Sequence, residues 1–202
     1  CGGGRCVEGT DRGFPGCGAA SGVATRSLAI PLARYPELSG FTEANTAYVE
    51  VAVELGERAI RTALEAAHIA PEEVDAIVMV SSTGVAVPTI DARIASRIGF
   101  RPDIKRIPLF GLGCVAGAAG TARVHDYLRG FPGHVAVLLS VELCSLTLQR
   151  DDVSIPALIG ACLFGDGAAA VVVTGADWIP MAPTADPGPS VLATRSRLFP
   201  DT

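Results

Sequence analysis

Apolar and polar positions along the chain follow two periods, one typical of helices and the other of buried strands. Apolar side chains recur on one helical face between Thr42 and Ala67, at Val49, Val53, Ile60 and Leu64. Thr42 or Asn45 is a candidate amino-terminal cap, and Pro71 marks the end of this helix. A second predicted helix begins at Thr89 and has Ile90, Ile94 and Ile98 on one apolar face. Gly99 is its predicted carboxyl-terminal cap.

Four apolar runs have the length of strands, and helical segments separate them. The runs cover residues 76–81, 105–110, 135–140 and 168–173. Further helices are predicted from Cys114 to about Gly130 and over residues 156–163. The runs lack polar alternation, which is typical of a sheet that helices cover on both faces. The pattern therefore predicts an α/β protein.

The first twenty residues differ from the rest of the chain. Residues 1–20 are rich in glycine and show no helical or alternating period. Cys1, Cys6 and Cys17 can in principle bind a metal or form disulfides, but zinc sites usually carry close-spaced cysteine pairs or added histidines. We expect a disordered or unrelated lead-in over 1–20, no metal site, and a folded domain over 21–202.

Composition narrows the range of partners. Hydrophobic residues make up 49% of the chain, charged residues 18%, and the net charge is −5, without a basic cluster. Nucleic acid and anionic membrane are therefore not expected as partners. The sequence shows neither an apolar run of membrane-spanning length nor a secretory leader, and its six cysteines are scattered. We expect a reduced, cytoplasmic protein.

Cys114 is the candidate nucleophile. It lies between a strand-like run and a small-residue helix, in the segment Gly-Leu-Gly-Cys-Val-Ala-Gly that covers residues 111–117. Free N–H groups and the positive end of a helix dipole stabilise a thiolate, and the thiolate is the form that attacks an acyl carbon. The alternative is a small buried cysteine that packs under the turn.

Three sequence motifs, and their order along the chain, resemble those of the type III polyketide synthases, the chalcone and stilbene synthase family, in its bacterial branch. They are the Cys114 segment, Ser-Val-Glu-Leu-Cys-Ser-Leu-Thr at 140–147, and Leu-Phe-Gly-Asp-Gly-Ala-Ala-Ala at 163–170. Residues 82–88 and 191–202 also resemble family segments. The Phe-Gly-Asp-Gly motif is shared with type III ketoacyl synthases, whereas the other two motifs indicate the polyketide synthases.

The resemblance implies the amino-terminal half of a thiolase-like fold, a mixed sheet covered by helices. Family members are about twice as long and carry their catalytic His and Asn in the second half. We therefore expect this chain to be truncated before that half and inactive alone. His68, His125 and His134 do not replace the missing histidine, and surface or capping roles are expected for them.

The resemblance also implies a reaction and its residues. Cys114 would take an acyl starter from coenzyme A, and decarboxylated malonyl-CoA would extend it, giving alkylpyrones, alkylresorcinols or related aromatic products. Phe164 matches the gatekeeper of the substrate tunnel, although core packing would also explain a phenylalanine. Ser82, Cys144 and Thr147 match chamber positions, and Val87 matches a loop residue that crosses a homodimer interface. Coenzyme A thioesters are substrates, and no cofactor is expected.

The sequence supports hypotheses for Glu142 and Arg26 and leaves two alternative functions open. Glu142 is expected to form structural hydrogen bonds rather than to catalyse. Arg26 is a candidate for coenzyme A binding that the sequence does not assign. A second hypothesis is another thiolase-fold condensing enzyme, such as a type III ketoacyl synthase or a hydroxymethylglutaryl-CoA synthase relative. A third hypothesis is that the chain is a non-catalytic, truncated dimer partner.

Overall fold

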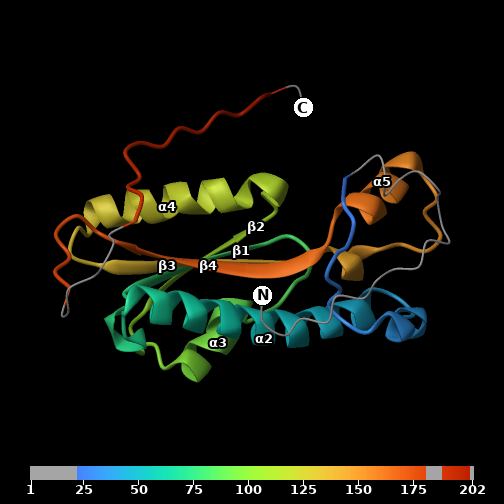
Figure 1. The fold of residues 1–202 in the computed structure, drawn as a ribbon, viewed down its shortest axis with the longest axis horizontal. Helices are drawn as coiled ribbons and strands as arrows, with labels where there is room; N and C mark the ends of the chain where they lie inside the picture. The colour runs from blue at the N-terminus through green and yellow to red at the C-terminus, as the bar shows by residue number, and fades with distance from the viewer. Residues whose placement is uncertain (1–21, 181–187, 201–202) are drawn as a thin grey trace.

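The structure is a computed structural model that describes residues 22–180 and 188–200. A mixed sheet lies between helices, so the predicted α/β class is confirmed (Figure 1). The predicted lead-in over residues 1–20, with Cys1, Cys6 and Cys17, lies outside the described residues. None of the described helices combines the length and the apolar character that crossing a lipid bilayer requires.

The first half of the chain forms two helices and two parallel strands. A short 3-10 helix, η1 (Leu32–Glu37), precedes the long helix α2 (Phe41–Ala67), and η2 (Pro71–Glu73) leads into β1 (Ala76–Ser81). Helix α3 (Ile90–Ile98) then connects β1 to β2 (Lys105–Phe110). Both strands have the predicted bounds. The αL conformation of Gly99, with φ of 90°, ends α3 as the sequence predicts.

The second half begins with the segment that carries the candidate nucleophile. The 3-10 turn η3 (Gly113–Val115) runs into α4 (Ala116–Gly130), which is followed by β3 (Val135–Leu143) and η4 (Cys144–Thr147). Helix α5 (Ile155–Leu163) and strand β4 (Asp166–Thr174) complete the fold. Strands β3 and β4 are longer than predicted, because their ladder continues as far as the pair Leu143 and Asp166.

Strand order in the four-stranded sheet of the described residues is β2-β1-β3-β4. Strand β1 is parallel to both β2 and β3, whereas β4 is antiparallel to β3. The carboxyl ends of β1, β2 and β3 therefore meet at one edge of the sheet. The segments that follow these three strands carry Ser82, Cys114 and Cys144, so the topology brings three predicted site residues to that edge.

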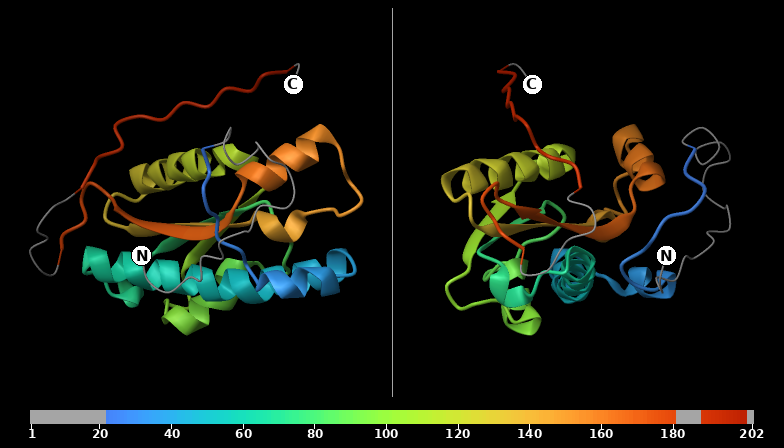
Figure 2. Two further views of the ribbon diagram at one scale, coloured as in Figure 1. Left: turned by 45° about the vertical axis from the view of Figure 1, so that its right-hand side comes forward. Right: turned by 60° about the vertical axis from the view of Figure 1, so that its left-hand side comes forward.

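Helices cover the two faces of the sheet unequally. Helices α2 and α3 lie on one face, and α4 lies on the other (Figures 1 and 2). The larger core, between the sheet and α2 and α3, includes Tyr48, Ile60, Ile94 and Leu139. Helix α4 covers β1 and β3 closely, since a Cβ on Gly120 would lie 2.6 Å from Leu138 Cδ1. Helices thus cover both faces, as expected, although Val171, which pairs with Leu138 of the α4-side core, is 54% exposed.

The amino-terminal cap of α2 differs from the prediction. Gly40 is the cap residue, and Thr42 and Asn45 both lie within the helix. The side chain of Asn45 is engaged elsewhere, because it hydrogen-bonds both backbone groups of Val85. A long-range contact thus takes the polar group that the local pattern assigned to capping. At the other end, His68 adopts the αL conformation as the carboxyl-terminal cap, with φ of 55°.

Candidate functional site

Cys114 occupies the turn between β2 and α4. Gly111 and Gly113 have φ values of 83° and 54°, a conformation that side chains with a Cβ rarely adopt, and together they reverse the chain after the strand. Cys114 is exposed and lies in η3, two residues before α4 begins at Ala116. The unpaired N–H groups of the first turn of α4 favour negative charge nearby. In the described residues, Cys114 therefore does not pack under the turn.

Ser82 and Glu142 connect the ends of the neighbouring strands β1 and β3. The Ser82 backbone N–H donates to both carboxylate oxygens of Glu142, at 3.0 and 3.1 Å, and its hydroxyl donates to Oε1 at 3.0 Å. Beside them, the backbone N–H of Leu143 donates to Thr83 Oγ1 at 2.8 Å. Glu142 is therefore hydrogen-bonded, as expected, and it holds the Ser82 segment against β3.

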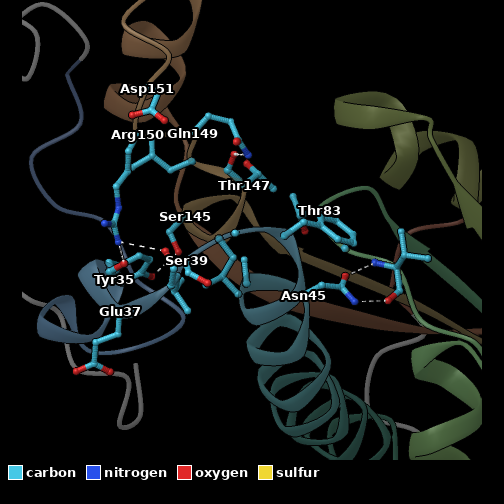
Figure 3. Close-up of a pocket in the computed structure, with 18 of the residues that line it drawn as sticks. Tyr35, Glu37, Ser39, Asn45, Thr83, Ser145, Thr147, Gln149, Arg150 and Asp151 are labelled. Atoms are coloured by element: carbon cyan, nitrogen blue, oxygen red, sulfur yellow. Dashed lines mark hydrogen bonds between the residues drawn. The ribbon is translucent and has the colours of Figure 1, made fainter.

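The loop after β1 is held from the side of α2. Asn45 Nδ2 donates to the carbonyl of Val85 at 2.9 Å, and Asn45 Oδ1 accepts from the Val85 N–H at 2.8 Å (Figure 3). A Cβ on Gly84 would lie 2.2 Å from Cγ of the buried Tyr48 ring, so the loop backbone packs directly on that ring. Val87 follows in the same loop, 88% exposed and joined to Pro88 by a cis peptide.

Two cavities adjoin the segment that contains η4. The larger, of about 680 Å³, is shown in Figure 3 and is lined by Ser82, Phe110 and Thr147 among others. The smaller, of about 390 Å³, is lined by Cys144, Thr147 and Phe164 together with residues of α5. The fold thus brings four of the six predicted site residues to two adjoining cavities. Cys114 and Val87 are not lining residues of either cavity.

Electrostatics distinguishes the two free thiols of the described residues, those of Cys114 and Cys144. Burial raises the pKa of the Cys144 thiol above its ordinary value, and the negative charges of Glu142 and Asp166 act in the same direction. Cys144 therefore keeps its proton more firmly than an ordinary thiol, which suits a cavity wall better than a nucleophile.

Histidines of the described residues lie away from the Cys114 edge. His68 ends α2, and His134 precedes β3 at the opposite edge of the sheet. His134 Nδ1 is 2.7 Å from the hydroxyl of Tyr127, and its ring stacks on Phe131. His125 lies along α4, with Nδ1 3.8 Å from Asp126 Oδ1. His68 has a capping position, as the sequence predicts, whereas the His125 side chain is only 14% exposed and its Nδ1 is buried without a hydrogen-bond partner, so a surface role does not describe it.

Four polar residues at this edge have roles that the sequence analysis did not identify: Tyr35, Asn45, Ser145 and Asp166. Asp166 accepts hydrogen bonds from Ser145 and from the backbone of Ala29. For Asp166, the available sequence signal was its position within the Phe-Gly-Asp-Gly motif. Arg26, the unassigned coenzyme A candidate, donates to the carbonyls of Ala161 and Cys162 near the end of α5.

Comparison with known proteins gives one family and a consistent set of relatives. Residues 30–178 match the model of chalcone and stilbene synthases, N-terminal domain. The chain is 54% identical over 183 residues to 1,3,6,8-tetrahydroxynaphthalene synthase of Streptomyces peucetius subsp. caesius, covering 90% of this chain and 47% of the relative. It is 31% identical over 155 residues to phloroglucinol synthase of Pseudomonas fluorescens, covering 77% of this chain and 44% of the relative.

A solved structure shows the same fold. The crystal structure of 1,3,6,8-tetrahydroxynaphthalene synthase from Streptomyces coelicolor A3(2), a bacterial type III polyketide synthase, superposes with a TM-score of 0.76 at 34% identity. The match covers 79% of this chain and 46% of that chain. The predicted thiolase-like fold is confirmed. The chain spans about half the length of the curated relatives it matches.

Proposed function

Since the chain belongs to the chalcone and stilbene synthase family, the type III polyketide synthases, we propose that it carries the nucleophile and part of the substrate chamber of an acyltransferase. This enzyme condenses an acyl-CoA starter with malonyl-CoA. The observation that supports the proposal most strongly is the exposed Cys114 two residues before α4, on the sheet edge where the Ser82 and Cys144 segments also meet.

The proposed reaction proceeds through a thioester on Cys114. The Cys114 sulfur attacks the carbonyl carbon of the starter, and coenzyme A leaves as its thiol. Malonyl-CoA then loses carbon dioxide, and the resulting carbanion attacks the Cys114 thioester, forming a carbon–carbon bond and releasing the sulfur. Covalent catalysis divides the acyl transfer into two easier steps. The His and Asn of the family's second half would assist the ionisation of Cys114 and stabilise the thioester oxygen.

Chamber roles are proposed for four residues. Cys144, Thr147 and Phe164 line one cavity, and Ser82 and Thr147 line the other, so all four can contact a growing chain. Phe164 is 51% exposed, which fits a gatekeeper at an entrance better than a core side chain. Glu142 orients Ser82 without itself taking part in the chemistry.

Aromatic compounds or pyrones are the proposed products. Relatives named as tetrahydroxynaphthalene synthase and phloroglucinol synthase support an aromatic product. Cys144 supports the same product classes. Bacterial family members that make alkylpyrones, alkylresorcinols or tetrahydroxynaphthalene carry a cysteine at this chamber position. The raised pKa of Cys144 keeps it a neutral thiol in contact with the intermediate.

A homodimer that acts in the cytoplasm is the proposed assembly. Val87 is almost fully exposed, yet the Asn45 contacts hold its loop in place, as a preformed interface element requires. The net charge of −5 gives no support to nucleic acid or anionic lipid as a partner.

The proposed function is tested with the full-length protein. Purified protein is incubated with malonyl-CoA and a set of acyl-CoA starters, and products are identified by liquid chromatography and mass spectrometry. Polyketide formation that is lost in Cys114→Ala supports the proposal. Absence of product with every starter, or full activity in Cys114→Ala, refutes it. The 202-residue chain alone is proposed to release no polyketide, and turnover by that chain would refute this part.

A further inference from the structure

Asp166 joins three segments at the start of β4. Its Oδ1 accepts from the backbone N–H of Ser145 at 2.8 Å, and its Oδ2 accepts from the Ser145 hydroxyl and from the backbone N–H of Ala29. Its own backbone N–H donates to the carbonyl of Ser27 at 3.1 Å. One residue thus fastens the segment 27–29 and η4 to the strand that follows Phe164.

A chain of hydroxyl groups extends from this carboxylate. An ionised carboxylate only accepts hydrogen bonds, so the Ser145 hydroxyl must donate to Asp166. The Ser145 oxygen is then free to accept from the hydroxyl of Tyr35, which lies 2.5 Å away (Figure 3). Burial, and to a smaller extent the charge of Asp166, raise the pKa of Tyr35, so its phenol keeps the proton that it donates.

Tyr35 and Ser145 stand between the two cavities. Both residues line the cavity of about 680 Å³ and also the cavity of about 390 Å³. The backbone of Tyr35 is fixed as well, because the guanidinium of Arg150 donates to its carbonyl (Figure 3). The hydroxyl chain therefore holds a partition whose position depends on Asp166.

We propose that Asp166 is a positioning residue that limits the size of the acyl chain by holding Tyr35 and Ser145 as the partition between the two cavities. The proposal rests on the proposed function, and it names the residue that sets chain-length selection in that chamber. Loss of the carboxylate charge weakens the hydrogen bonds that Ser145 donates to Asp166, and the Ser145 hydroxyl is in turn the acceptor for Tyr35. The partition then moves more easily, and a longer chain reaches from one cavity into the other.

The first test measures chain-length selection in the full-length protein. Equal amounts of a short and a long acyl-CoA compete for Cys114, and intact-protein mass spectrometry gives the ratio of the two acyl groups. Asp166→Asn is expected to raise the long-to-short ratio by about three- to tenfold, the range that corresponds to one net hydrogen bond. Tyr35→Phe should shift it in the same direction. The double variant should shift it no further, because both changes break one network.

Controls separate positioning from simple loss of stability. Asp177→Asn makes the same change of charge beyond the other end of β4, at an exposed position, and should leave the ratio unchanged. A smaller folded fraction lowers both acyl signals equally, so it does not alter their ratio. An unchanged ratio in Asp166→Asn, an equal shift in Asp177→Asn, or additive shifts in the double variant would overturn the proposal.

A second test does not depend on catalysis. Cys144 lines the smaller cavity, so its rates of alkylation by a small and a bulky N-alkyl maleimide report the room beside the partition. Asp166→Asn should raise the bulky-to-small ratio at Cys144 by about three- to tenfold. If the wild-type protein accepts no acyl-CoA but this ratio rises, the proposed function fails and the positioning role stands. If acyl-CoA is accepted and neither ratio changes, the positioning role fails alone.

Discussion

Ser82 donates both its backbone N–H and its hydroxyl to the carboxylate of Glu142, within 3.1 Å in each case. This pair continues the connection between β1 and β3 beyond the last residues of their ladder, Val80 and Ser140. It holds the loop with Val87 and the segment with Cys144 in a fixed relation, although these segments lie far apart in the sequence.

Glu142→Gln should destabilise the fold by about 1–3 kcal/mol, because a half-buried amide group then faces the donors of Ser82. Urea unfolding followed by circular dichroism measures the change. Glu50→Gln, at an exposed position of α2, is the matched control and should change stability by less than about 0.5 kcal/mol. Equal effects of the two substitutions would show that the Ser82 contacts contribute no net stability.

Gly84→Ala should destabilise the protein through steric overlap with the Tyr48 ring. The new methyl group would lie 2.2 Å from Cγ, an inner ring atom of a side chain that is 1% exposed, so the loop must move. Gly130→Ala is the control, since a Cβ there meets nothing within 4 Å in α4, and its effect should be neutral or favourable by up to about 1 kcal/mol. Thermal unfolding that gives both variants the same Tm would contradict this account.

The Cys144 thiol should react slowly with iodoacetamide near neutral pH. A raised pKa lowers the thiolate fraction at any given pH, so its alkylation should become fast only above the ordinary thiol range of about 8–9. Peptide mass spectrometry over a pH series gives the rate for this cysteine alone. Glu142→Gln removes one of the negative charges that raise the pKa, so the rate curve should move to lower pH. Alkylation of wild-type Cys144 at neutral pH as fast as that of free cysteine would refute the assignment.

Cys144→Phe should shorten the polyketide before it prevents starter loading. The larger side chain fills part of the cavity of about 390 Å³, and a growing chain loses about 0.8 kcal/mol for each CH2 that it can no longer bury. The full-length protein is compared with the variant by product analysis, using one short and one long acyl-CoA. Loss of Cys114 acylation in a folded variant would place Cys144 in the catalytic apparatus. An unchanged product profile with both starters would place it outside the chamber.

The sequence predicted the main elements well, because apolar runs bounded by glycine and proline leave few alternatives for a buried sheet. Strands β1 and β2 have the predicted bounds, and Gly99 ends α3 as expected. The periodicity of apolar positions along the chain also predicted the α/β class. It could not show that Val171 is half exposed, because coverage of a sheet face depends on where a helix lies and not on the strand itself.

The site was only partly predictable. The turn that presents Cys114 follows from local glycines, and the resemblance supplied the cavity residues Cys144, Thr147 and Phe164. The Asn45 contact with Val85 and the contact between Tyr35 and Ser145 join residues 40 and 110 positions apart, so no local pattern reveals them. These contacts are set by tertiary packing, which decides the partners of polar side chains that short-range rules would assign to caps or to solvent.

The proposed reaction depends first of all on acylation of Cys114. Full-length protein is incubated with acyl-CoA in the absence of malonyl-CoA, digested, and mapped by peptide mass spectrometry. We expect a starter-sized mass increase on the peptide that contains Cys114, and none on the peptide that contains Cys144. An acyl group on Cys144 with Cys114 unmodified, or no acylated peptide at all, would contradict it.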